Sequence, residues 1–138
     1  MSVGGFLLKV LTSYGASVFV VTLVVLWWGS FPGGIQSLDW AGVMLCLKLS
    51  AVFSLPFFVL VGLPYMSFGY RSWGRESVLA FMAGGGALGS LGSLAFGMLL
   101  TMPQTVPAFF PIGGFLAGAI SSVVWTALAN RWGAHAND

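Results

Sequence analysis

The sequence predicts an all-α integral membrane protein, a bundle of four transmembrane helices. Composition is the first reason: 58% of residues are hydrophobic and 6% are charged, against about a quarter charged in a soluble domain. The second is that four apolar runs, each near the roughly 20 residues that cross a bilayer, fill most of the 138-residue chain. The third is that basic residues flank these runs on alternate sides. We therefore expect one transmembrane domain, residues 1–138.

The first apolar run extends from about residue 10 to residue 29. It ends at Trp27 and Trp28, aromatic residues of the kind that settle at a membrane interface. A signal peptide is the competing interpretation, but the apolar core is long for one and the two bulky tryptophans make a poor cleavage site. We expect the run to be retained as the first helix.

The second run covers about residues 40–63. Pro56 lies well inside it and should bend the helix, because the proline ring lacks an N–H group. Pro64 should end it. The following segment, 65–77, is the most polar and most aromatic part of the chain, and it predicts a surface loop.

The third and fourth runs cover about residues 77–102 and 108–129. The link between them is short and rich in proline, which indicates a tight turn. The tail, residues 130–138, is too short to fold alone.

The basic residues predict the orientation, because short cytoplasmic loops hold an excess of Lys and Arg. Lys9 precedes the first predicted helix, Arg71 and Arg75 lie between the second and third, and Arg131 follows the fourth. The other two connections contain no basic residue. We expect both termini and the middle loop on the cytoplasmic side of a membrane, the bacterial inner membrane being the one that we favour.

Small residues recur at every fourth position in the third and fourth runs. In lipid, helices associate by close approach of their backbones, and small residues four apart permit it. This spacing favours packing within the bundle; self-association, or docking onto another membrane protein, is the functional alternative. The predicted helix-packing residues are Gly85, Gly89, Ser93 and Gly97 in the third run and Gly114, Gly118 and Ser122 in the fourth.

Lys48 is the one ionisable residue that the sequence places well inside a predicted crossing. It lies about eight residues, or roughly 12 Å, from the outer end of the second helix. A charged lysine in hydrocarbon costs a few kcal/mol or more unless it is paired, faces water or reaches the interface. The plain interpretation is a side chain that extends to the outer headgroups; the functional alternatives are contact with a partner protein or an anion path.

Arg71 and Arg75 are candidates for contact with a cytoplasmic partner or with anionic lipid. Their plain interpretation is as anchors of the predicted loop at the membrane surface.

Several classes of function are disfavoured. The basic residues are scattered singly, so no nucleic acid partner is expected. No Asp or Glu falls within a predicted crossing, which argues against an ion-coupled transporter. The chain has one Cys and one His, and we expect no enzymatic activity, no metal and no cofactor.

Two classes remain. The first is an interaction protein that binds another membrane protein through its helices, as an accessory subunit, an assembly factor or an inhibitor. In size and layout the chain resembles the four-helix immunity proteins that protect bacterial membranes against pore-forming toxins. The second is an oligomeric channel or carrier for a neutral or anionic small solute. We favour the first class, because so few polar groups lie within the predicted crossings.

Overall fold

A computed structural model describes residues 3–29, 40–100 and 109–134, which are helical apart from a short turn at 75–77. Four of the helices are long and apolar enough to span a membrane. The elements in chain order are α1 (Val3–Gly29), α2 (Trp40–Phe57), the π-helices η1 (Phe58–Gly62) and η2 (Tyr65–Gly74), α3 (Val78–Leu100) and α4 (Phe109–Ala134).

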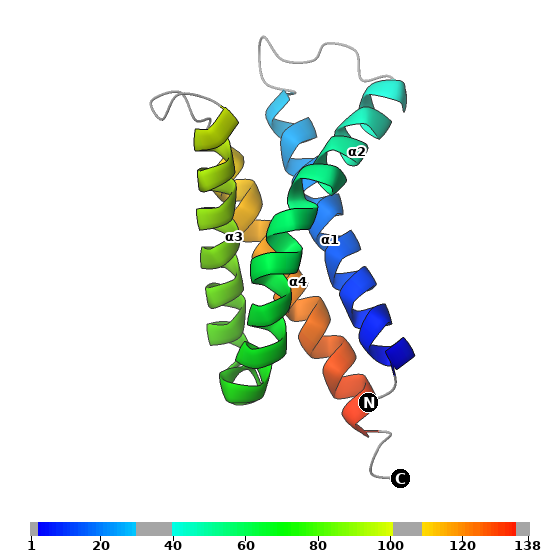
Figure 1. Cartoon of the computed structure of the whole chain (residues 1–138), viewed down its shortest axis with the longest axis vertical. Helices are drawn as coiled ribbons and strands as arrows, with labels where there is room; N and C mark the ends of the chain where they lie inside the picture. The colour runs from blue at the N-terminus through cyan, green and yellow to red at the C-terminus, as the bar shows by residue number, and fades with distance from the viewer. Residues whose placement is uncertain (1–2, 30–39, 101–108, 135–138) are drawn as a thin grey trace.

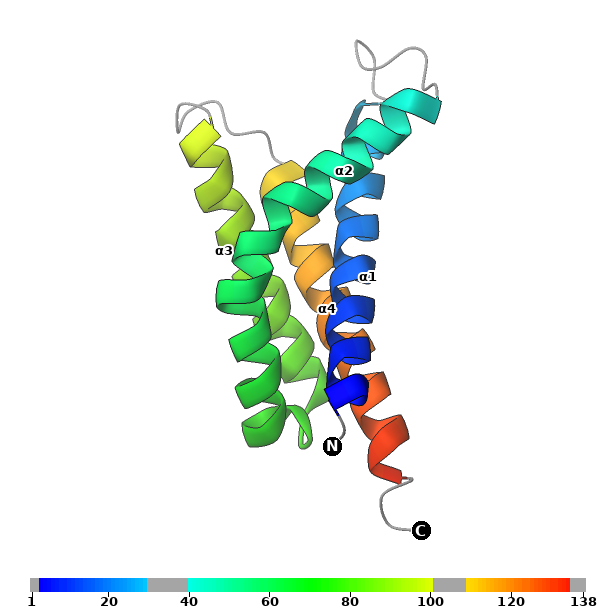
Figure 2. The same cartoon turned by 45° about the vertical axis from the view of Figure 1, so that its right-hand side comes forward.

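Helix α4 occupies the middle of the bundle (Figure 1). It packs against α3 on one side and α1 on the other, and these are the two most extensive contacts in the structure. Helix α2 makes a smaller contact with α1 and crosses the other helices obliquely (Figure 2). In the apolar stretch of α4, 44% of the residues are buried, whereas in that of α2 6% of the residues are buried. Helix α2 is therefore the least covered of the four.

The start of α1, the turn between η2 and α3, and the end of α4 lie at the same end of the bundle (Figure 1). Lys9, Arg71, Arg75 and Arg131 belong to these segments, and we call this the basic end. Lys48 belongs to the half of α2 nearer the opposite end. The arrangement is the one that an even number of crossings produces.

The second helix continues past both of its prolines, contrary to the loop expected at 65–77. Pro56 lies inside α2, a helix that changes direction along its length (Figure 2), and Pro64 sits in helical geometry at φ −57° and ψ −46°. Because a proline ring clashes with the carbonyl four residues earlier, the wider π-helical turn accommodates it. The Leu63 N–H accordingly donates to the Phe58 carbonyl, five residues back. The expectation that Pro64 ends the helix was wrong.

Two helix boundaries also differ from the expected ones. Helix α1 begins at Val3, so Lys9 lies within the helix and not before it. Helix α4 continues to Ala134, and Arg131 belongs to its last turn. Helix α3 begins just after Ser77, whose Oγ accepts a hydrogen bond from the Ala80 N–H at 3.2 Å, an ordinary N-cap. The two connections without basic residues lie outside the described residues.

The core is aromatic and lies toward the basic end. Its main cluster consists of Phe58, Met66, Phe81 and Trp125, contributed by η1, η2, α3 and α4. Phe81 is fully buried and stacks on Tyr65 with ring centroids 5.1 Å apart. Aromatic contacts between different elements therefore hold together the half of the bundle nearer the basic end.

Candidate functional site

The contact between α3 and α4 brings two backbones together at glycines. A Cβ atom added to Gly85 would lie 2.8 Å from the Gly118 carbonyl oxygen, and one added to Gly89 would lie 2.9 Å from the Gly114 carbonyl carbon. Added Cβ atoms at Gly114 and Gly118 would overlap the carbonyl oxygens of Gly89 and Gly85 in turn. No other residue type fits at these four positions unless the helices separate.

The two serines of the same stripes complete this contact. The Ser93 Oγ lies against Gly114, and the Ser122 Oγ lies against Gly85. The Ser122 hydroxyl donates to the Gly118 carbonyl of its own helix at 2.9 Å. Gly97 is buried one turn further along α3. The predicted helix-packing residues thus lie inside the bundle, where they are covered by the chain itself.

Helix α3 also receives large side chains at three other glycines. The Tyr65 hydroxyl lies at Gly84, the Phe115 ring at Gly86 and the Phe57 ring at Gly92. These rings come from η2, α4 and α2. Helix α3 is consequently approached from more than one side, as its many glycines permit.

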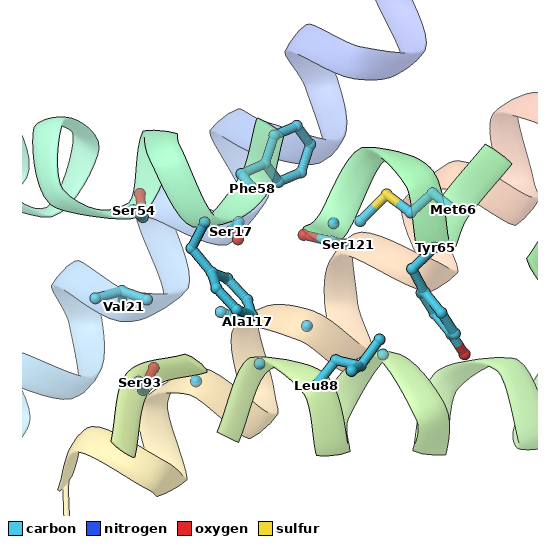
Figure 3. A pocket seen from close by; sticks show the side chains of 16 residues that line it. Ser17, Val21, Ser54, Phe58, Tyr65, Met66, Leu88, Ser93, Ala117 and Ser121 are labelled. Carbon is cyan, nitrogen blue, oxygen red and sulfur yellow. The ribbon is translucent and has the colours of Figure 1, made fainter. Parts of the chain in front are cut away.

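A cavity of about 80 Å³ lies where the four helices meet. Each helix contributes one serine to its wall: Ser17 from α1, Ser54 from α2, Ser93 from α3 and Ser121 from α4 (Figure 3). The four contact glycines Gly85, Gly89, Gly114 and Gly118 line it as well. None of the described residues in this wall is an Asp, Glu, Lys, Arg or His. The wall is therefore uncharged and mostly apolar, and the four serine hydroxyls and the Tyr65 phenol are its polar side-chain groups.

Tyr65 is the titratable side chain in the wall of this cavity. Its hydroxyl donates to the Phe81 carbonyl at 2.8 Å. Burial raises the pKa of the Tyr65 phenol above its ordinary value, and a backbone hydrogen bond opposes this in part. The phenol is therefore protonated and neutral at physiological pH.

Two of the serine hydroxyls in the wall donate to backbone carbonyls. The Ser121 hydroxyl donates to the Ser13 carbonyl at 2.9 Å and so connects α4 to α1. The Ser54 hydroxyl donates to the Ser50 carbonyl at 2.6 Å. The Ser13 hydroxyl is fully buried and has no hydrogen-bond partner in the described part of the chain, which is uncommon for a buried polar group.

Lys9 is a charged residue inside the bundle that the sequence did not reveal. Its side chain is 6% exposed, and its ammonium nitrogen lies 5.5 Å from the centre of the Trp125 ring, within range of a cation–π interaction. Phe6 meets the same ring edge-on at 6.1 Å. The sequence placed Lys9 before the first helix, whereas the structure places it within α1 and within a candidate membrane span, Val3–Trp27. The apolar residues before Lys9, among them Phe6, were the available signal that the helix begins earlier.

Lys48 lies on a continuous exposed strip of α2. The members of this strip, which we call the Lys48 face, are Ala41, Leu45, Lys48, Val52 and Leu55, all of them exposed. Their spacing alternates between four and three residues, the pattern with which one helix packs along another. None of the residues of α2 is buried, so this face is not used inside the chain.

Arg71 and Arg75 are exposed at the basic end, on η2 and the turn that follows it. The Arg75 guanidinium lies 5.9 Å from the centre of the Tyr70 ring. The Tyr70 hydroxyl donates to Asn130 Oδ1 at 2.6 Å and so connects η2 to α4. The η2 helix that carries Arg71 is thus held against the bundle by a hydrogen bond to α4. This basic end lies at the opposite end of the bundle from the first turns of α2 (Figure 1).

The structure therefore brings the small residues of α3 and α4 together and leaves Lys48 and the two arginines apart. Within residues 3–29, 40–100 and 109–134, no three His, Cys, Asp or Glu side chains gather closely enough to hold a metal ion. No family model, no curated protein and no solved structure matches the chain.

Proposed function

We propose that this chain is an interaction protein of the bacterial inner membrane, that its basic end faces the cytoplasm, and that it binds another membrane protein through the Lys48 face of α2. The orientation is supported by the four basic residues on segments at one end of the bundle. The binding face is supported by the exposure of Lys48 on an apolar helix strip that the rest of the chain leaves uncovered.

The exposed charge is the observation that carries the proposal. Apolar residues of a spanning helix need no partner in lipid, so Leu45, Val52 and Leu55 by themselves indicate nothing. Lys48 differs, because a charged side chain two turns inside a span is costly unless a polar group meets it. A partner helix packed along this face supplies that group.

A second copy of this chain fits the face poorly. Two copies inserted with the same orientation pack about a two-fold axis normal to the membrane, which brings each residue near its own counterpart. Lys48 would then face Lys48, and like charges at that depth repel each other. The described residues of the four candidate spans include no Asp or Glu that could form an ion pair with the Lys48 ammonium group of the second copy.

The partner is accordingly a different membrane protein with a carboxylate or another hydrogen-bond acceptor at the depth of Lys48. The small-residue stripes of α3 and α4 are already covered within the chain, so the contact depends on α2. An accessory subunit, an assembly factor and an immunity-type inhibitor all act by such a contact.

Photocrosslinking in native membranes tests this proposal. A benzoylphenylalanine placed at Leu45 or at Val52 is expected to give one discrete adduct with a protein of another mass. The matched control is Leu91 on α3, which is 63% exposed against 58% for Leu45 and lies outside the Lys48 face. The control position should give no such adduct.

Variants at Lys48 identify the contact. Lys48→Met should reduce the adduct at least about tenfold, the effect expected when a buried charge loses its partner, and Lys48→Arg should retain most of it. Expression and insertion should be unchanged in both. Adducts of the chain with itself alone, an equal yield from Leu91, or a Lys48→Met variant that crosslinks normally would each overturn the proposal.

A further inference from the structure

The cavity at the meeting point of the four helices goes beyond the function proposed for α2. We propose that it is a binding site for a small, uncharged molecule that both donates and accepts hydrogen bonds, of about the size of urea. The observations that carry this inference are the position of the cavity, its volume, and the one serine that each helix contributes (Figure 3).

The volume sets the size of the ligand. A space of about 80 Å³ exceeds what a single water molecule needs, and it is smaller than the roughly 150 Å³ of a cavity that holds benzene. It therefore admits a few water molecules or one small polar molecule.

The cavity is also prevented from closing. Helices α3 and α4 already touch through Gly85, Gly89, Gly114 and Gly118, so they cannot move closer to fill it. The Phe57 ring on the α2 side is seated against Gly92. An open space at this position is thus a consequence of the backbone contacts, and wall atoms that face an empty space lack van der Waals partners.

The hydroxyls determine the chemistry of the ligand. The protons of Ser54 and Ser121 are already donated to backbone carbonyls, so these two oxygens present only acceptor lone pairs to the cavity. A ligand must donate to them. Ser17 and Ser93 from the facing helices supply hydroxyls that can donate to the ligand in return.

Charge is excluded for a separate reason. None of the described residues in the wall carries a charge, and an ion without a partner in this environment loses its hydration without compensation. The site therefore selects neutral amides, alcohols and water over ions of equal size.

Thiol labelling in proteoliposomes tests the inference. Ser93→Cys and Ser54→Cys are each made in a Cys46→Ser background, so that two helices report on the same space and the loss of one variant leaves the other. Both thiols should react with neutral methyl methanethiosulfonate at least about tenfold faster than with a trimethylammonium-bearing methanethiosulfonate. A Leu91→Cys thiol, exposed on the outer surface of α3, should react with neither.

Urea is the probe for occupancy. A ligand of so few atoms binds weakly, and about 1 M urea should slow the neutral reagent at the cavity thiols at least about threefold, as a dissociation constant near 0.5 M gives. Sucrose at equal concentration should not slow this reaction. Neither urea nor sucrose should slow the reaction of a Ser72→Cys control on η2. Absence of labelling at both cavity thiols, equal reaction with the charged reagent, or no protection by urea would overturn the inference.

Discussion

Replacing Gly89 by alanine is expected to destabilise the bundle by about 2 kcal/mol or more, although the change adds one methyl group. The added Cβ would lie 2.9 Å from the Gly114 carbonyl carbon and would overlap its oxygen. A backbone atom cannot rotate away as a side chain can, so the helices must move apart, and overpacking of this kind costs about 1–3 kcal/mol. Separation would also open the contact at Gly85 and Gly118.

Gly15→Ala is the matched control, and it should raise the free energy of unfolding, whereas Gly89→Ala should lower it. Nothing lies within 4 Å of a Cβ added at Gly15 in α1, and alanine favours a helix over glycine by about 1 kcal/mol. Unfolding of both variants by titration with sodium dodecyl sulfate, followed by circular dichroism, gives the two free energies. Equal effects at the two glycines would show that α3 and α4 do not touch by their backbones.

Phe81→Ala is expected to cost about 3 kcal/mol, within the range for removal of a buried aromatic side chain. Phe81 is fully buried. Its ring stacks on Tyr65 and meets the edge of the Tyr70 ring with centroids 6.0 Å apart. Because both tyrosines belong to η2, the variant should loosen η2 from α3 in particular.

Phe19→Ala separates this effect from the loss of a phenylalanine in general. Phe19 is 58% exposed on α1, where lipid can replace the ring, so its removal should change stability by less than about 1 kcal/mol. The same titration measures both variants. A Phe19→Ala loss as large as that of Phe81→Ala would contradict the aromatic core at the basic end.

Much of the fold follows from the apolar runs, because helices that face lipid must be long and must satisfy their own backbone hydrogen bonds. The boundaries at residues 29 and 40 agree with the expected ones. The continuation through Pro64 was not predictable from propensity, since it depends on π-helical turns that remove the clash of the proline ring.

The candidate site was less accessible from the sequence. A stripe of small residues locates a face that permits close contact, but the identity of the helix that covers it depends on tertiary structure. Lys9 shows the same limit: its place over Trp125 joins residues far apart in the chain. The cavity arises from serines on four different helices, which share no spacing that a sequence pattern reveals.

The side of the membrane reached by the turn between η2 and α3 tests the central claim most directly. A single cysteine at Ser72, in a Cys46→Ser background, is labelled with a membrane-impermeant maleimide, and reporters fused to each end of the chain mark the termini. Four crossings predict that Ser72→Cys and both reporters lie on the same side, and the basic residues predict that this side is the cytoplasm. Labelling of Ser72→Cys from the side opposite either terminus would contradict the four-span bundle.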